Sequence, residues 1–326
     1  MSASSAKYLL CAEAVTAAGF NLDVSVAVGE SDLDMYDTAT LADQEARITV
    51  APVTYLESDA VGAERALALL TLLVEQLTAR LPGTVSSVPL YVRMPEVVTQ
   101  RLLDEWLQTM HAQESSHKTI SRVKLSHDAA HAHFTQVLNV LAEEEILLAV
   151  SIDAPIADLE ALAADNQLQT NQHPWGVIAS EGGAGVIMAS RSFVEAMKIE
   201  PLATFDGWSC EPDEGRHLMS RVLRRHSRSV DQLGLLFSDM TNLRTHQEDY
   251  GFAVGAKGEA LLNPEQVIQS HSLWGYLGHA SLYATLALAA RYPNVLRNRS
   301  AFLFGADHSR AMLTLTLAAP SAETGA

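Results

Sequence analysis

The chain is poor in cysteine and in basic residues. Only two of its 326 residues are cysteines, Cys11 and Cys210, and their wide separation excludes a disulfide framework or a CxxC site. Lys and Arg number 22 against 39 Asp and Glu, which gives a net charge of −17 at pH 7. A surface of this sign repels phosphate backbones and anionic lipids, so we expect no binding of nucleic acid or of a membrane surface.

Long apolar runs are also missing. No segment reaches the ~18–20 apolar residues that span a bilayer, and the first residues, MSASSAKYLLCAEAV, match a secretory signal poorly. Hydrophobic residues make up 48% of the chain and charged residues 19%, which is typical of a soluble globular protein with a substantial core. We therefore expect a cytoplasmic protein.

Strand-like and helix-like segments alternate along the chain, which favours an α/β fold. The pattern predicts strands at 7–14, 48–53, 88–92, 146–152, 175–180, 185–190, 233–237, 300–304 and 311–317. It predicts helices at 60–80, 97–111, 129–142, 214–228 and 277–291. The helix at 277–291 is apolar nearly all round, and the strand at 146–152 is continuously apolar, so both should be covered on several sides.

Four motifs occur in order along the chain. An Ala130-His131 pair opens the helix that leads to the apolar strand at 146–152, and the glycine-rich run SEGGAGVIM occupies 180–188. LGHASL at 277–282 begins the apolar helix, and FLFGADH at 302–308 precedes the last strand. Together these motifs resemble the landmarks of a β-ketoacyl synthase of the thiolase-like superfamily. The resemblance implies a five-layered αβαβα fold of two similar halves, residues 1–168 and 169–326, and a homodimer.

The catalytic groups of that family have no counterpart in this sequence. Where the family has its cysteine nucleophile, the segment KLSHDAAH at 124–131 places Ser126. The turn of the first histidine reads SDMTN at 238–242, with Met240 or Thr241 near the histidine position. The position before the apolar helix reads LWGY at 273–276, so His271 or His279 could serve only with a shifted alignment. We take Ser126, Thr241, Asn242, His279 and Phe304 as candidates for a vestigial site with no confident catalytic residue.

These departures favour a catalytically inactive binding or adaptor protein. A thiolate is nucleophilic near neutral pH, whereas a serine hydroxyl needs an adjacent base. The segment 239–253 also resembles a divergent group encoded beside bacterial type VI secretion effectors, which suggests an accessory role in effector loading. Two alternatives remain open: a serine-based acyltransferase in which His131 or His279 assists Ser126, and a ketosynthase partner subunit that resembles a chain-length factor. The partner would be a secretion effector or a carrier protein.

Other clusters carry weaker signals. Ser126, His127 and Asp128 are consecutive, and neighbouring residues on a turn point in different directions, so they do not form a catalytic relay by sequence alone. His127, His131 and His133 lack the further ligands of a metal motif, and we expect neither a metal nor a cofactor.

A basic stripe is predicted on one face of the helix at 214–228. Its members recur at intervals of three and four residues: Arg221, Arg224, Arg225 and Arg228. The stripe could dock an acidic partner or an anion, or it could be a solvated face that pairs with neighbouring carboxylates.

Overall fold

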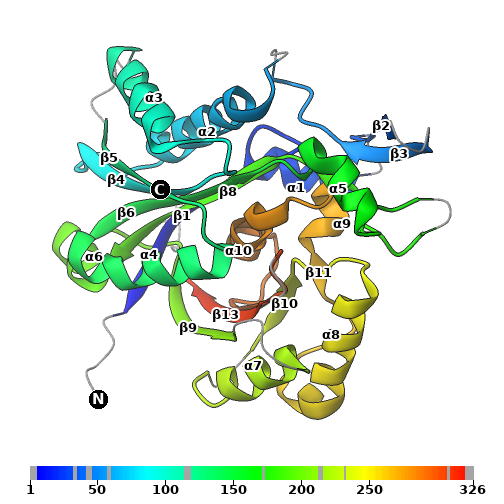
Figure 1. Cartoon of the computed structure of the whole chain (residues 1–326). Helices are drawn as coiled ribbons and strands as arrows, with labels where there is room; N and C mark the ends of the chain where they lie inside the picture. The colour runs from blue at the N-terminus through cyan, green and yellow to red at the C-terminus, as the bar shows by residue number, and fades with distance from the viewer. Residues whose placement is uncertain are drawn as a thin grey trace.

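A ten-stranded sheet organises the chain in the computed structural model, and helices cover it in layers (Figure 1). The structure describes residues 6–31, 35–41, 46–56, 60–113, 119–170, 173–211, 216–230, 233–306 and 309–319. Within these residues the strand order is β11-β10-β12-β13-β9-β1-β8-β6-β4-β5. Strands β5 and β11 are therefore the two edges of the sheet.

The ten strands divide into two units with the same topology. The first unit contains β1 (Lys7–Val15), β4 (Ser87–Arg93), β5 (Thr119–Ser126), β6 (Ile146–Asp153) and β8 (Gly182–Ser190). The second contains β9 (Ala203–Glu211), β10 (Leu235–Ser238), β11 (Ile268–Gln269), β12 (Asn298–Leu303) and β13 (Arg310–Leu317). Each unit has the spatial order third, second, fourth, fifth, first, and in each the fifth strand runs antiparallel to its neighbours. Antiparallel pairing of Lys7–Leu9 with residues 203–205 joins the two units.

This repeat places the division later than the sequence analysis did. The glycine-rich run at 180–188 falls within the half that was expected at 169–326. It forms most of β8, which pairs with β6 along its whole length and with β1, so it belongs to the first unit. The second unit starts with β9 at Ala203. Glycine in a strand leaves no side chain to reveal which neighbours it packs against, so the composition of the run does not indicate which unit it joins.

Three layers of helices alternate with two layers of strands, one from each five-stranded unit (Figure 1). We call the strand layer of the first unit the first sheet and that of the second unit the second sheet. The outer helices α2 (Gly62–Ala79) and α3 (Gln100–Gln113) cover the first sheet, and α7 (Leu218–His226) packs on the second with α8 (Arg244–Lys257) beside it. The central layer holds α4 (Ala130–Glu144) and α10 (Ser281–Arg291). Three separate apolar clusters fill the spaces between these layers. The predicted five-layer thiolase-like architecture is thus confirmed.

The central helix α10 has the composition that its position demands. Every one of its residues from Ser281 to Ala290 is buried, and it contacts strands of both sheets. A helix between two sheets has no solvent-facing side, so it must be apolar all round. Trp274 precedes it and is fully buried, and its Nε1 donates a hydrogen bond to the carbonyl of Ser25 at 2.8 Å.

The remaining elements surround this framework. A small sheet contains β2 (Asp37–Leu41), β3 (Ala46–Ala51) and β7 (Ala179–Ser180). The shorter helices are α1 (Leu22–Glu30), α5 (Leu159–Ala164), α6 (Arg191–Met197) and α9 (Ser270–Trp274). Single 3₁₀ turns are η1 (Pro155–Asp158), η2 (Gly258–Ala260) and η3 (Gly278–Ala280).

Most predicted elements are present, with some differences. The strand expected at 175–180 is reduced to β7, and α1, β5, β9 and α8 were not expected. The helix expected at 214–228 begins at Leu218, and residues 214 and 215 lie outside the described residues. Among the described helices none has the length and hydropathy to cross a membrane.

His226 closes α7 and is buried against the second sheet. Its Nδ1 lies 3.1 Å from Ser209 Oγ on β9, and its Nε2 lies 2.8 Å from Thr314 Oγ1 on β13. Burial lowers the pKa of the imidazole to about 4 from its ordinary 6.5. The folded protein therefore favours neutral His226, whereas the unfolded chain gains a proton below pH 6.5.

We expect His226 to make the fold acid-labile. Because the folded pKa lies below the unfolded one, the stability that neutral His226 contributes is present above pH 6.5 and is lost as the pH falls towards 4. The gap between 6.5 and about 4 corresponds to at most ~3 kcal/mol. Urea unfolding of the wild type and of His226→Gln from pH 7.5 to 4.5 tests this. The variant should be less stable than the wild type at pH 7.5, and the difference between their free energies of unfolding should become smaller as the pH falls. A difference that does not change with pH would contradict a neutral, buried His226.

Candidate functional site

The carboxyl ends of the parallel strands in the first unit converge at one edge. β4 ends at Arg93, β5 at Ser126 and β6 at Asp153, and the chain turns from β5 into the central helix α4. Ligands of open α/β sheets bind outside the carboxyl ends of their strands. The topology therefore places the candidate site at this edge, beneath the first turn of α4.

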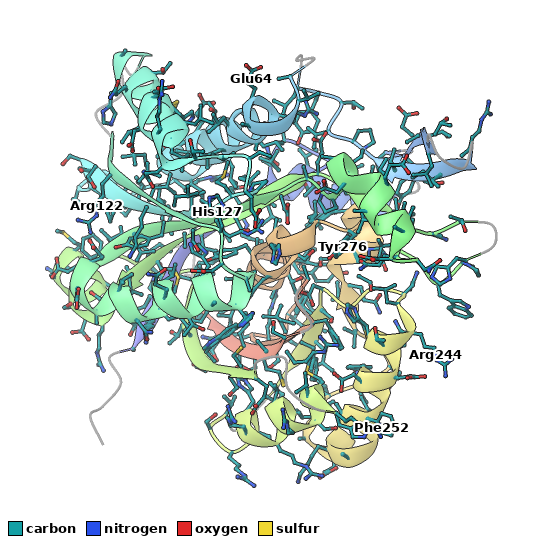
Figure 2. All side chains as sticks on the ribbon, in the orientation of Figure 1. Glu64, Arg122, His127, Arg244, Phe252 and Tyr276 are labelled. Carbon is teal, nitrogen blue, oxygen red and sulfur yellow. The ribbon has the colours of Figure 1, made fainter. Side chains whose placement is uncertain are left out.

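Ser126 belongs to the turn that starts α4. Its Oγ donates to Asp128 Oδ2 at 3.1 Å and accepts the backbone N–H of Asp128 at 3.1 Å. The neighbouring His127, labelled in Figure 2, is exposed, and its Nδ1 lies 3.0 Å from the carbonyl oxygen of Met94. Among the described residues, no imidazole is hydrogen-bonded to Ser126, so none of them is placed as the base that activates a serine nucleophile.

Neither cysteine lies at this edge. Cys11 is in the middle of β1 and packs in the cluster beneath α2, where burial raises the pKa of its thiol to about 11. Cys210 is on β9 in the second unit, in register with Ala311. A thiol with a pKa of about 11 is protonated at neutral pH, so Cys11 is not an activated nucleophile.

Arg93 and Asp153 connect the first unit to the turn before α10. Arg93 Nη1 lies 3.1 Å from Asp153 Oδ2, and the same oxygen accepts the backbone N–H of His279 at 2.8 Å. The carbonyl of His279 accepts the Ser151 hydroxyl at 3.2 Å. Gly278 makes this approach feasible: its φ is +54°, and a Cβ there would lie 2.5 Å from Asp153 Oδ2. His279 is thus held by its backbone on β6, and its ring is half-buried.

The three histidines near the elbow have separate partners. His127 contacts the Met94 carbonyl, whereas His131 Nδ1 lies 2.7 Å from Ser309 Oγ. His133 Nδ1 lies 2.9 Å from the hydroxyl of Tyr283 on α10. No group of three potential metal ligands occurs among the described residues.

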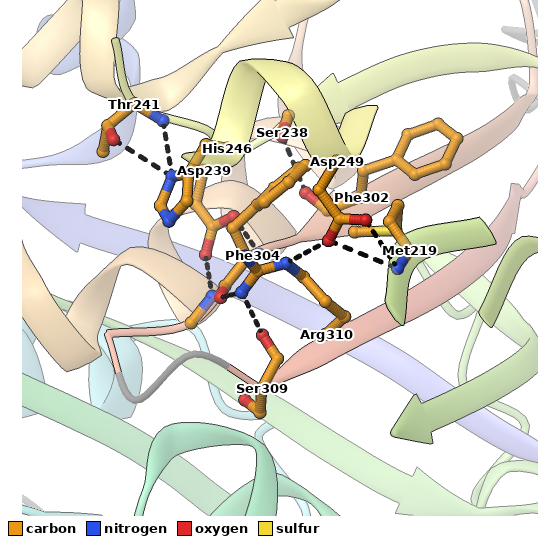
Figure 3. A network of polar contacts seen from close by, with 11 residues as sticks. Met219, Ser238, Asp239, Thr241, His246, Asp249, Phe302, Phe304, Ser309 and Arg310 are labelled. Carbon is orange, nitrogen blue, oxygen red and sulfur yellow. Dashed lines mark hydrogen bonds and ion pairs between the residues drawn. The ribbon is translucent and has the colours of Figure 1, made fainter. Parts of the chain in front are cut away.

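A buried polar network occupies the matching edge of the second unit (Figure 3). Asp239 follows β10, and its carboxylate accepts the N–H groups of Phe304 at 2.6 Å and Gly305 at 3.4 Å. Burial raises the pKa of Asp239 to about 6, and the two N–H groups and Arg310 oppose the rise. The Asp239 carboxylate thus fixes the start of the loop between β12 and β13.

Arg310 ties the same loop to α8. Its Nε lies 2.8 Å from Asp249 Oδ2, its Nη1 donates to the Phe304 carbonyl at 2.7 Å, and its guanidinium lies over the Phe304 ring. Asp249 also accepts the N–H of Met219 at the start of α7. Arg310 and Asp249 are both largely buried, with side chains 6% and 12% exposed.

The sequence candidates fall into two groups. Thr241 and Phe304 are fully buried around His246: Thr241 Oγ1 lies 3.0 Å from its Nδ1, and the Phe304 ring centroid is 4.9 Å from that of His246. Ser126 lies in the first unit and bonds Asp128, and Asn242 is exposed. The fourth motif reads into 307–308, which lie outside the described residues.

Sequence reasoning missed the charged residues that organise both edges. They are Arg93, Asp153, Asp239, Asp249 and Arg310. Two of them, Arg93 and Asp153, could have been found from the sequence, because each is a charged residue at the end of an apolar strand. Ligand-binding residues of parallel sheets lie at the carboxyl ends of the strands.

Three of the four arginines of the basic stripe lie on α7, Arg228 follows the end of this helix, and the stripe is partly paired. Arg225 forms an ion pair with Glu211, and Arg221 lies 3.8 Å from the same carboxylate. Arg225 also donates to the carbonyl of Cys210 at 3.2 Å. Two of the four arginines thus pair with a neighbouring carboxylate, as a solvated face would; docking of an acidic partner on Arg224 and Arg228 stays a prediction.

The duplicated strand order and five layers define the thiolase-like fold of ketosynthases, and solved structures agree. A chain of the AntDE:AntF assembly, a type II PKS acyl-carrier protein in complex with its ketosynthase bound to the hexaketide, aligns with a TM-score of 0.70 at 10% identity, over 97% of this chain and 100% of that one. The ishigamide ketosynthase/chain length factor gives 0.69 at 12% identity, over 97% and 100%. The ketosynthase from module 6 of the bacillaene synthase of Bacillus subtilis 168 gives 0.69 at 10% identity, over 97% and 73%. No family model and no curated protein matches the chain.

The buried pair of Arg310 and Asp249 can be tested against an exposed pair on the same helix. Asp249→Ala leaves the Arg310 guanidinium buried without its carboxylate, and we expect a loss of ~3–5 kcal/mol in the free energy of unfolding. Glu248→Ala removes the partner of Arg244, whose side chain is 87% exposed (Figure 2), and should cost less than ~1 kcal/mol. Urea unfolding of both variants measures the difference, and equal losses would show that the buried network does not stabilise the second unit.

Proposed function

We propose that this protein is a ketosynthase-like binding protein that does not catalyse condensation. The observation that carries the proposal is the chemistry of the elbow between β5 and α4. There, Ser126 bonds Asp128 rather than an imidazole, and both cysteines lie elsewhere. Without a thiolate or an activated hydroxyl, the acyl chain of a substrate has no group to which it can be transferred.

A partner-subunit role is the more specific form of this proposal. The ketosynthase/chain length factor among the similar structures supports a protein that assembles with a catalytic partner or a carrier protein. The accessory role beside type VI secretion effectors remains a prediction that rests on the resemblance of residues 239–253. A serine-based acyltransferase is the competing function. It requires that the Ser126 hydroxyl becomes acylated.

Covalent acylation distinguishes these functions. We expect no acyl adduct when the Cys11→Ser/Cys210→Ser protein, which lacks adventitious thiols, is incubated with S-octanoyl-N-acetylcysteamine and examined by intact mass. Ser126→Ala should give the same spectrum, as should Ser121→Ala, a control at an exposed position of the same strand. An octanoyl adduct that disappears only in Ser126→Ala would establish the acyltransferase instead.

We further propose a homodimer that forms through β5. This strand pairs with β4 on one side only and is an edge of the described sheet, so its outer backbone groups are available to a second copy. A two-fold axis would pair β5 with itself in antiparallel orientation. Light scattering at micromolar concentration should give about twice the 35.2 kDa chain mass. A mass equal to one chain would contradict the dimer.

A further inference from the structure

A cavity of about 550 Å³ opens where α4 lies beside β9 and the first residues of β1 (Figure 1). Helix α4 contributes Thr135, Leu138 and Asn139 to its wall, β1 contributes Lys7, and β9 contributes residues 204–208. Sites for small molecules have volumes of ~300–1,000 Å³ and combine apolar walls with a few polar groups. The cavity therefore has the size and the mixed lining of a ligand site.

This cavity is separate from the turn that holds Ser126. Ser126 precedes the first turn of α4, whereas Asn139 lies in the second half of the helix, which runs over Ala130–Glu144. A rise of about 1.5 Å per residue puts ~14 Å of helix axis between Ala130 and Asn139. A ligand in the cavity would therefore not depend on the chemistry of the elbow.

Two aromatic side chains form the apolar part of the wall. Phe205 and Trp208 are half-buried and belong to β9. Phe134 on α4 packs edge-to-face against Trp208, with ring centroids 4.9 Å apart, and its centroid lies 5.9 Å from that of Phe205. The Trp208 Nε1 donates to Thr135 Oγ1 at 3.1 Å, which fixes the orientation of the indole. The two rings thus offer a pre-organised surface to a flat apolar group.

The same cavity contains one positive and one negative side chain. Lys7 is paired directly with Phe205 between β1 and β9, so its side chain lies on the same face of the sheet as that ring. Asp206 is the extra residue of a β-bulge: both of its neighbours on β9 have a paired residue on β13, and Asp206 has none. Bulges redirect side chains and are frequent beside functional sites. The Thr316 hydroxyl donates to Asp206 Oδ2 at 2.6 Å and so positions the carboxylate.

The two charges leave each other unpaired. Among the described residues, neither Lys7 nor Asp206 takes part in an ion pair, and the Lys7 ammonium has no hydrogen-bond partner. Partial burial raises the pKa of the Asp206 carboxyl above its ordinary value, and the bond from Thr316 opposes the rise. A ligand with a single charge would pair with one side chain and cover the other without a partner, which is costly. A ligand with both charges would satisfy both.

We propose that this cavity binds a zwitterionic ligand with a flat apolar group, of the class of free aromatic amino acids. The carboxylate of the ligand pairs with Lys7, its ammonium pairs with Asp206, and its apolar group packs against Phe205 and Trp208. This inference goes beyond the proposed function, because it requires no residue of the elbow and no acyl ligand.

Three probes that share a phenyl ring and differ in charge test the site. They are phenylalanine, which is zwitterionic at pH 7.5, phenethylamine, which keeps the ammonium alone, and 3-phenylpropionate, which keeps the carboxylate alone. Calorimetric titration of the full chain should show phenylalanine binding at least about tenfold more tightly than either relative, which equals ~1.4 kcal/mol. The net charge of −17 by itself favours the cation, so phenethylamine that binds as tightly as phenylalanine would overturn the proposal.

Two variants remove one charge each. Lys7→Gln should raise the Kd of phenylalanine and 3-phenylpropionate about tenfold without weakening phenethylamine. Asp206→Asn should raise the Kd of phenylalanine and phenethylamine by the same factor without weakening 3-phenylpropionate. Lys257→Gln on α8 and Asp104→Asn on α3 change the net charge of the protein equally at positions away from the cavity, and they should leave all three Kd values unchanged.

The pattern of responses decides the outcome. Absence of phenylalanine binding, or Kd values that respond equally to the cavity variants and to their controls, would overturn the site. If a cavity variant fails to fold, ¹⁵N NMR of the wild type decides instead. The Trp208 indole N–H resonance, assigned by its loss in Trp208→Phe, should shift when phenylalanine is added. A Trp208 resonance that stays in place would refute the site.

Discussion

The antiparallel pairing between the first residues of β1 and β9 is the constraint on which the rest of the molecule depends. It joins two sheets of identical topology, and α4 and α10 occupy the space between them. Helix α10 has no exposed side from Ser281 to Ala290, and His133 on α4 is buried, so polar groups in this space must find partners inside the protein. The bonds of His131 to Ser309 and of His133 to Tyr283 are this kind of internal satisfaction.

Much of the architecture could be predicted because a segment that is buried on all sides is apolar along its whole length. The uniformly apolar segment at 277–290 and the strand at 146–152 indicated central elements, and both are central. The order of the repeat could not be read in the same way. β8 begins with four small residues, Gly182 to Gly185, and its pairing partners are decided by distant strands. β5 alternates polar and apolar residues at a sheet edge, where patterns are weak.

The candidate site was less accessible to sequence reasoning, for a physical reason. Arg310 and Asp249 are 61 positions apart and Phe304 and Asp239 are 65 apart, and only the folded chain brings them together. Sequence patterns pointed to the turns at Ser126, Thr241 and Phe304 as candidates, and their role as a site stays a prediction. The patterns did not identify the charged residues that hold those turns. A charged residue can be buried when it pairs with an opposite charge, and the sequence does not show which residue that partner is.

Gly278 illustrates what a short motif can record. The Gly-His pair before α10 exists here because the backbone of residues 278 and 279 lies against the Asp153 carboxylate, where any side chain on Gly278 would collide with it. The glycine is therefore required by packing, whatever the neighbouring imidazole does. A genome survey that counts this dipeptide would therefore gather proteins by the shape of their interior, whatever reaction each of them performs.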